Sequence, residues 1–406
     1  MNDIRRTILW VIFGFSLVLL WDQWQVFNGN KPTFLPSSKP AVTAPAAGTP
    51  ATANGVPTAS AAPGSAGAVP TSALPAAPRE KVNVTTDLFK ATIDSEGATV
   101  NYLELLKYDE ADRSKHVVLF EDGAPATRYV AQTGLLNPVA GEAFPNHLTQ
   151  MTPKACPREM ADGQNTLEVS FESAPVGGLK YVKTYVFHRG DYAIGVRHEV
   201  VNVSDQPRDA LLYMQLLRHG TVAAGTMFGT NTFTGPAAYT NEKKFHKLDF
   251  KDIAKGKIEP PPPANDGWIA MVQHYFASAW LLKGDPASEQ LRREFRVKDL
   301  GDNLFTVSMV ATLPKIAPGA TQVVNSALFA GPEEEKKLEA IAPGLDLVKD
   351  YGIFAIISKP LYWLLTQLHG ILGNWGWSIV ALVVLLKAAF YWLNAKAYAS
   401  MAKMKA

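Results

Sequence analysis

One charged residue interrupts a long apolar run in this chain of 406 residues. The run extends from Trp375 to Ala395, and Lys387 lies inside it. At 1.5 Å per residue, a helix of about twenty residues matches the roughly 30 Å hydrocarbon core of a bilayer, and tryptophans are enriched at both membrane interfaces. A lysine inside such a span costs about 2.5–3.5 kcal/mol, so its presence indicates a function.

Physical chemistry leaves two interpretations of Lys387 open. Lys396 follows about nine residues later, roughly 13 Å along a helix, so the Lys387 side chain could extend part of the way to the interface. Alternatively, its helix borders a water-filled cavity on the cytoplasmic side, where a positive charge attracts acidic or polar segments of a translocating chain.

Other residues with chemical potential lie in the central region. A metal or acid–base site could assemble from its histidines and a carboxylate such as Glu199, but the histidines lack ligand spacing, which favours separate positions on strand rims and faces. Cys156 is the single cysteine, so no intramolecular disulfide can form, and it is expected to be an inert packing or loop thiol. The seven histidines are His116, His147, His188, His198, His219, His246 and His274.

Familiar catalytic motifs and a nucleic-acid charge pattern are both missing from the sequence. No Gly-rich phosphate loop, HExxH, GxSxG or paired CxxC motif occurs in a meaningful context, so we expect no enzyme, no cofactor and no metal. The balance of 39 basic and 37 acidic residues gives no basis for nucleic-acid specificity. The 47% hydrophobic content, with apolar runs in two places, is typical of a membrane-tethered globular protein.

The first 78 residues predict an anchor and a tether. Arg5 and Arg6 precede an apolar run with no small-x-small cleavage site, so residues 1–27 are expected to be an uncleaved transmembrane anchor and not a signal peptide. Residues 28–78 are rich in Ala, Pro, Thr, Ser and Gly, which predicts a disordered linker. Because basic residues flank both apolar runs on their outer sides, we expect the N-terminus in the cytoplasm and residues 28–374 on the far side of the membrane.

Residues 79–345 have an all-β pattern of short runs rich in Val, Tyr, Phe and Thr. Val82–Ile93 is expected to turn into Thr99–Leu105 as a hairpin, and Tyr192–Val200 should bury every second side chain, including His198. The absence of a βαβ rhythm favours a large antiparallel sandwich. Further strands are predicted at Tyr181–His188, Trp268–Leu282 and Leu304–Leu313.

Helices are predicted after the sandwich. Glu333–Ala342 should form a short helix, and residues 353–373 an amphipathic helix with Ser358 as N-cap. The apolar face of that second helix suits the outer membrane interface, although a core-packing helix has the same pattern. Residues 375–395 should span the membrane, and residues 396–406 should begin a cytoplasmic loop. The predicted bend between these helices uses Gly370, Gly373, Asn374 and Gly376.

Specific strings resemble the Gram-negative type of the Oxa/YidC/Alb family of membrane insertases. The start of that family's insertase core is similar to Gly373–Ile379, Lys387 and Lys396–Met404, and its interfacial helix is similar to Asp350–Gly352 with Ser358–Leu361. Further similar strings in the region before these helices are Gly331–Glu333, Gly267–Ala277, Lys183–Thr184 and Arg189–Ala193.

The resemblance implies a multi-pass protein of the bacterial inner membrane. It implies a β-supersandwich periplasmic domain and an insertase core whose polar, cytoplasm-facing groove receives nascent inner-membrane proteins, alone or with the Sec translocon and its accessory subunits. A ribosome is a further partner implied for the full-length protein, and the bilayer is the surrounding medium. Lys387 occupies the place of the family's groove charge, which makes it the expected substrate-binding residue.

This sequence departs from the family pattern at three points. The family often has arginine at the position of Lys387, and lysine lacks the planar fork for bidentate contacts. Trp392 occupies a position where relatives can have proline, so a kink there is unsupported. The sequence stops at Ala406, just past the first core helix, so we expect a C-terminally truncated chain that lacks insertase activity by itself.

Two other functions remain open from the sequence. Supersandwich folds also serve sugar mutarotases, so the chain could be a membrane-anchored periplasmic carbohydrate-binding or mutarotase-like protein, for which histidines and glutamates must converge in a cleft. A purely structural scaffold is the third interpretation.

Overall fold

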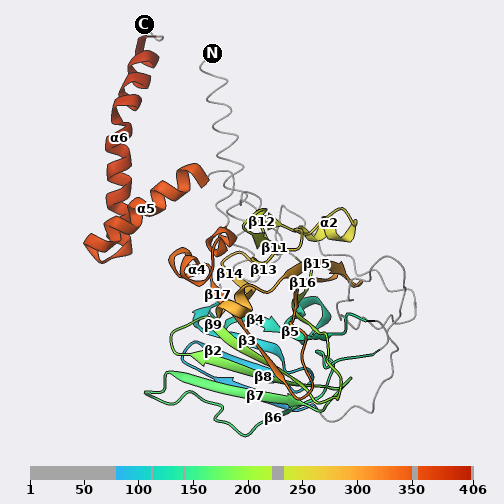
Figure 1. Cartoon of the computed structure of the whole chain (residues 1–406). Coiled ribbons are helices and arrows are strands. Elements are labelled where there is room, and N and C mark those ends of the chain that lie inside the picture. Colours follow the sequence, from blue (N-terminus) through green and yellow to red (C-terminus); the bar gives the residue numbers. More distant parts are fainter. Residues whose placement is uncertain (1–78, 111–112, 140–141, 222–232, 350–354, 404–406) are drawn as a thin grey trace, which may run out of the picture. The chain divides into compact units, whose positions relative to one another are not determined.

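The structure of this chain is a computed structural model, which describes residues 79–110, 113–139, 142–221, 233–349 and 355–403 (Figure 1). The predicted anchor at residues 1–27 and the linker at residues 28–78 lie outside the described residues, so both remain predictions.

Antiparallel strands make up most of the described chain between residues 81 and 332. Neighbouring strands pair antiparallel throughout both sheets, which confirms the predicted antiparallel β architecture. The strands are β1 (Lys81–Thr85), β2 (Phe89–Asp94), β3 (Thr99–Asp109), β4 (His116–Glu121), β5 (Tyr129–Leu136), β6 (Met151–Pro153), β7 (Thr166–Ser173), β8 (Leu179–His188), β9 (Ala193–Asn202), β10 (Leu211–His219), β11 (Gly235–Thr240), β12 (Lys244–Lys247), β13 (Trp268–Val272), β14 (Phe276–Leu282), β15 (Arg293–Asp299), β16 (Leu304–Thr312) and β17 (Thr321–Pro332).

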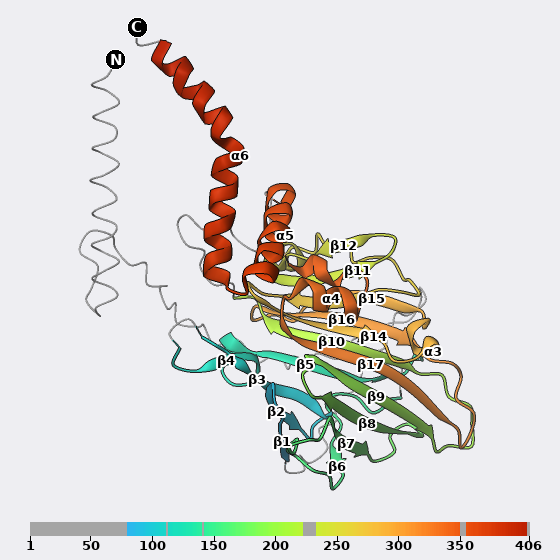
Figure 2. The same ribbon diagram turned by 90° about the vertical axis from the view of Figure 1, so that its left-hand side faces the viewer.

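The strands form two sheets, which can be followed in Figures 1 and 2. One sheet has eight strands in the order β1-β2-β3-β4-β5-β10-β16-β15, and the other has nine in the order β12-β11-β13-β14-β17-β9-β8-β7-β6. One continuous core joins them, and the Trp280 indole of the nine-stranded sheet donates to the Gln215 carbonyl of the other sheet at 3.1 Å. The two sheets therefore pack face to face.

Period-two alternation explains why the sequence predicts these strands well. In β9, the side chains from Ile194 to Asn202 are buried at every second position, and His198 is among the buried ones, as predicted. Burying one face of the strand stabilises its register, because a slip of one residue would place every apolar side chain in water.

The single strand predicted over Val82–Ile93 is wrong. The chain breaks after β1, where the Thr86 hydroxyl accepts hydrogen bonds from the backbone N–H groups of Leu88 (3.2 Å) and Phe89 (2.9 Å), and β1 then pairs with β2. Such side-chain to backbone bonds compete with strand pairing and favour a turn. The hairpin of β2 and β3 is confirmed.

A set of contacts, here called the exit clamp, holds the chain where it leaves the nine-stranded sheet. The Trp268 indole donates to the Pro343 carbonyl at 3.0 Å, and the Lys283 ammonium donates to the Ile341 carbonyl at 2.7 Å. At Gly344, where φ is +71°, an added Cβ would lie 2.3 Å from the Tyr239 ring. The exit segment is therefore packed directly on β11 and β13 and is bonded to the residue that follows β14.

Helices are short within the β region and long after it. α4 confirms the helix predicted over Glu333–Ala342, since it spans nearly the same residues. The helical segments are η1 (Pro125–Thr127), α2 (Phe250–Ala254), α3 (Pro286–Glu289), α4 (Glu335–Ile341), η2 (Leu345–Val348), α5 (Ala355–Leu372) and α6 (Trp375–Lys403).

The two long helices differ from the predictions at their ends. Ser358 lies inside α5 and is not its N-cap, because Ala355–Ile357 are already helical, and Pro360 therefore lies inside the helix and not in its first turn. α6 continues from Ala395 to Lys403, so the loop expected there is wrong over these residues, and no Gly or Pro occurs between Trp377 and Lys403 to stop the helix.

The break between α5 and α6 needs only two residues. Gly373 has φ +65° and its N–H donates to the His369 carbonyl, which closes α5. The Asn374 side chain accepts from the N–H groups of Gly376 (2.8 Å) and Trp377 (3.2 Å), which caps α6. Gly370 and Gly376, which the sequence also assigned to the bend, lie inside the helices.

Candidate functional site

Lys387 is exposed on α6 among exposed apolar side chains. One turn before it lie Val383 and Val384, which are 44% and 60% exposed, and one turn after it lie Phe390 and Tyr391, at 55% and 73%. Residues 351–406 contain no Asp or Glu, so α5 and α6 supply no counter-charge. Lys387 is therefore a cation surrounded by apolar side chains on a helix without an acidic residue, and it can attract an acidic or polar group.

In the part of the chain that the structure describes, no helix combines the length and the apolar character needed to cross a membrane.

The start of α6 is fixed to the end of α5 by an aromatic contact. The rings of His369 and Trp375 stack with their centroids 3.8 Å apart. On α5, four leucines are half-buried, whereas Trp363, Ile371 and Leu372 are 63%, 81% and 45% exposed. Both helices therefore leave large apolar side chains uncovered.

The histidines do not converge on one site. His116 pairs with Asp109 at 2.8 Å, and His219 contacts the Thr221 hydroxyl at 2.7 Å. His147 is buried and contacts the Tyr213 hydroxyl. Within the described ranges, no histidine joins a group of side chains that could hold a metal ion, which agrees with separate positions. The carbohydrate-binding alternative required a convergent cleft, so this dispersal counts against it.

Cys156 is a free, half-buried thiol that packs against the main core. This position agrees with the packing role expected from the sequence.

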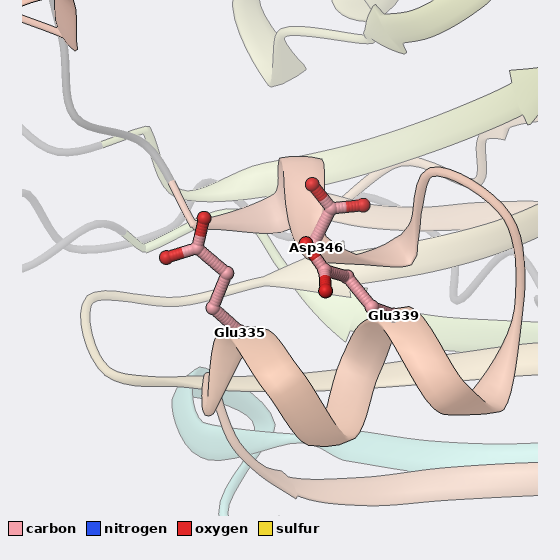
Figure 3. A group of neighbouring side chains, drawn as sticks. All are labelled: Glu335, Glu339 and Asp346. Atoms are coloured by element: carbon pink, nitrogen blue, oxygen red, sulfur yellow. The ribbon is translucent and has the colours of Figure 1, made fainter. Parts of the chain in front are cut away.

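Three carboxylates gather where α4 meets η2 (Figure 3). Oxygens of Glu335, Glu339 and Asp346 lie within 4.8 Å of one another. Glu339 is exposed and the other two are only half-buried, and surface acidic groups of this kind are common without a bound ion. We assign no metal site to them.

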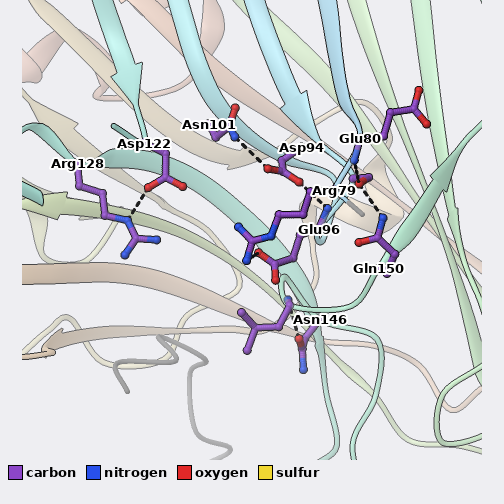
Figure 4. Close-up of polar contacts among 11 residues, drawn as sticks. Arg79, Glu80, Asp94, Glu96, Asn101, Asp122, Arg128, Asn146 and Gln150 are labelled. Carbon is purple, nitrogen blue, oxygen red and sulfur yellow. Dashed lines mark hydrogen bonds and ion pairs between the residues drawn. The ribbon is translucent and has the colours of Figure 1, made fainter. Parts of the chain in front are cut away.

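A polar network surrounds the turn between β2 and β3 (Figure 4). The buried Ser95 hydroxyl accepts from the Glu80 N–H at 2.8 Å and from the Gln150 amide at 2.7 Å. Arg79 forms an ion pair with Glu96 at 2.8 Å. Burial raises the pKa of Glu96, and the neighbouring Arg79 opposes this increase. The network is structural, because it fixes the turn against the loop that carries Gln150.

Lys183 is a fully buried amine that the sequence analysis did not select. From β8 it reaches the opposite sheet, where its ammonium donates to the carbonyls of Gly97 (2.5 Å), Ala98 (3.3 Å) and Thr133 (3.4 Å). No described carboxylate pairs with it, and burial lowers the pKa of Lys183 to about 7. The sequence could have indicated this burial, because Lys183 lies on the same face of the strand as the buried Tyr181 and Tyr185.

The neighbours of Lys183 complete a buried polar layer between the sheets. The Tyr181 hydroxyl contacts His198 Nδ1 at 2.6 Å, and His198 Nε2 contacts the Ser326 hydroxyl at 2.8 Å. Burial, and secondly Lys183, hold the pKa of His198 well below its ordinary value. Because these groups are fully buried, they can stabilise the sandwich but cannot reach an external substrate.

Comparison with known families decides the class of this chain. Residues 81–364 match the family model described as the YidC periplasmic domain. The chain belongs to the YidC family. The resemblance inferred from the sequence is therefore confirmed, and family membership makes this an inner-membrane protein with a periplasmic domain.

Curated relatives match nearly the whole YidC-family chain. Each of three relatives bears the name "Membrane protein insertase YidC". They come from Cupriavidus necator (49% identity), Ralstonia nicotianae (48%) and Burkholderia multivorans (45%), and each match covers 99% of this chain and 71% of the relative. These names agree with the insertase family that the sequence resembles.

Solved structures show a more distant likeness. A galactose mutarotase related enzyme from Lactobacillus acidophilus is 9% identical with a TM-score of 0.39, covering 62% of this chain and 97% of its own. A putative aldose 1-epimerase from Escherichia coli is 10% identical with a TM-score of 0.37, covering 62% and 99%. Scores this low carry no argument about function.

Proposed function

We propose that this chain acts in membrane protein insertion, helping inner-membrane proteins to insert, fold and assemble. The support is the name and identity of the curated relatives, which match 99% of the chain. Nascent membrane proteins are the proposed substrates, and the Sec translocon and the ribosome are proposed partners.

The observation that carries the proposal is the uncompensated cation on α6. Lys387 lies among exposed apolar side chains on a helix that has no acidic residue. Burying a Val, Leu or Phe side chain gains about 1.5–3 kcal/mol, so this exposed surface favours apolar surroundings. A lysine in such surroundings is stabilised where water or polar groups of a substrate can reach it, as in a polar groove open to the cytoplasm.

A membrane topology follows from the same proposal. Residues 1–27 anchor the N-terminus from the cytoplasmic side, residues 28–78 form a tether, and residues 79–345 form the periplasmic domain. Residues 353–373 lie in the outer interface, and residues 375–395 cross the bilayer. The basic residues outside both apolar runs support this orientation.

Exchange of Lys387 tests the groove charge. Lys387→Ala and Lys387→Arg are compared in a protein extended to the relatives' full length, in cells depleted of their own insertase. Because arginine keeps the positive charge, we expect Lys387→Arg to insert single-span substrates and Lys387→Ala to lose most insertion.

The matched control is Lys359→Ala, which removes an exposed lysine from the neighbouring α5. It should retain insertion. Equal insertion by the alanine and arginine variants at position 387 would remove the proposed role of the charge.

A further inference from the structure

Six exposed lysines cluster in one short stretch of the β region, here called the lysine edge. Between residues 241 and 258, six lysines stand against three acidic residues, a net charge of +3, whereas the whole chain has +2. All six are exposed. The lysine edge consists of Lys243, Lys244, Lys247, Lys251, Lys255 and Lys257.

Buried apolar side chains hold this stretch in place. Phe250 and Ile253 of α2 are only 5% and 7% exposed, and Leu248 is fully buried. Asp249 caps α2 by accepting from the Lys251 N–H at 2.8 Å. The lysines are therefore displayed outward from a segment that is anchored in the core.

The lysine edge lies beside the exit clamp. Lys244 in β12 pairs with Thr240 in β11, and the adjacent Tyr239 ring packs against Gly344. The buried Val348 is separated from the start of α5 at Ala355 by seven Cα steps, which reach about 25 Å at most. If α5 lies in the membrane interface, the chain itself keeps this part of the domain near the bilayer.

Protection of a sheet edge explains only part of the cluster. Lysines on an edge strand prevent pairing with other chains, and this role suits Lys244 and Lys247 in β12. Lys251, Lys255 and Lys257 lie on or after α2, outside the strand, so edge protection does not require them.

We infer that the lysine edge binds anionic phospholipid headgroups of the membrane to which the chain is attached. Phosphate and carboxylate groups on a lipid surface complement a row of exposed ammonium groups, and this attraction fades within a Debye length of about 8–10 Å. The inference rests on the membrane attachment proposed above.

Lysine acetylation can test this inference on the full chain. The chain is reconstituted into vesicles of neutral phosphatidylcholine, or of phosphatidylcholine with about 30% phosphatidylglycerol, and labelled with a membrane-impermeant acetylating reagent. Mass spectrometry gives the modification rate of each lysine. We expect the rates at Lys244, Lys251, Lys255 and Lys257 to fall at least about threefold in anionic vesicles and to recover in 0.5 M NaCl, because salt screens exposed charges.

Lys154 is the internal control, because it is 52% exposed and directly follows β6, the strand at the opposite edge of the nine-stranded sheet. Its rate should be the same in both vesicles. Equal rates for the lysine edge in both lipids, or an equal fall at Lys154, would overturn the inference. Protection by added polyglutamate but not by phosphatidylglycerol would also overturn it, in favour of an acidic polypeptide.

Flotation of the vesicles separates this result from the proposed function. A chain that does not float with either vesicle contradicts membrane attachment itself. A chain that floats but shows no lipid-dependent protection contradicts only the role of the lysine edge.

Discussion

Lys183 shows how a buried amine can be held when no described carboxylate pairs with it. Three carbonyl oxygens surround its ammonium, and two of them belong to Gly97 and Ala98, which both have positive φ. The left-handed region is costly for alanine, so the turn depends on its surroundings. The Tyr185 hydroxyl donates to the Ala98 carbonyl at 2.6 Å and helps to hold the strained residue.

Replacement of Lys183 by methionine should change the pH dependence of stability. The folded pKa is about 7 against an ordinary 10.5, so between these values the unfolded state binds more protons and the free energy of unfolding rises with pH. Between pH 7 and 9, the free energy of unfolding of the wild type should rise by roughly 2–3 kcal/mol relative to that of Lys183→Met, at about 1.4 kcal/mol per pH unit. Urea unfolding at each pH measures the difference.

Lys180→Met is the control for this experiment. Lys180 lies on the same strand, but it is partly exposed and pairs with Glu172. Its curve should stay parallel to the wild type between pH 7 and 9. A constant difference between the wild type and Lys183→Met over that range would contradict the lowered pKa of the buried amine.

Sequence reasoning selected Lys387 as a candidate but did not select Lys183. Lys387 is evident because it interrupts an apolar run, whereas Lys183 lies among residues that look like an ordinary alternating strand. Its burial depends on carbonyl groups of Gly97 and Thr133, which are 86 and 50 residues away in the sequence. Long-range contacts of this kind leave no local pattern.

At the scale of elements, periodicity predicted strands better than it predicted their ends. The alternation of β9 was read correctly, but the turn at Thr86 depends on a side-chain hydroxyl that accepts two backbone bonds. The extension of α6 to Lys403 was missed because the predicted helix was matched in length to a bilayer and ended at Ala395, although lysine and alanine favour helices. Pairing order and the exit clamp join distant segments and were not predicted.

Gly344→Ala should weaken the exit clamp. The added methyl group would meet the Tyr239 ring, so we expect a loss of about 1–3 kcal/mol from overpacking, beyond the cost of the positive φ. Gly319→Ala is a matched control, because Gly319 has the same φ of +71° and open space around it. Urea unfolding measures both variants, and equal losses would contradict the contact.

At the scale of the whole chain, apolar exposure is unevenly divided. Among the described residues, fourteen large hydrophobic side chains are exposed on α5 and α6, and only six are exposed on residues 79–349. Single exposed side chains are normal on soluble domains, whereas a concentration of them marks an interaction surface. The need for an apolar environment should therefore reside in the two long helices.

Two shortened chains test this division. We expect residues 79–349 to stay soluble and monomeric without detergent, because their exposed apolar side chains are few. Residues 79–403, which add α5 and α6, should require detergent to remain in the supernatant after ultracentrifugation. Sedimentation of both chains without detergent would contradict the division, and a cooperative unfolding transition of 79–349 serves as the folding control.

The exit clamp also has a mechanical consequence. Tension that enters the β region through the chain before α5 reaches η2 first, and then the contacts of Ile341, Pro343 and Gly344 with Lys283, Trp268 and Tyr239. Only after these contacts yield does the force pull on β17, which lies between β14 and β9 inside the nine-stranded sheet. The clamp therefore bears tension from α5 and α6 before that tension reaches an interior strand of the sheet.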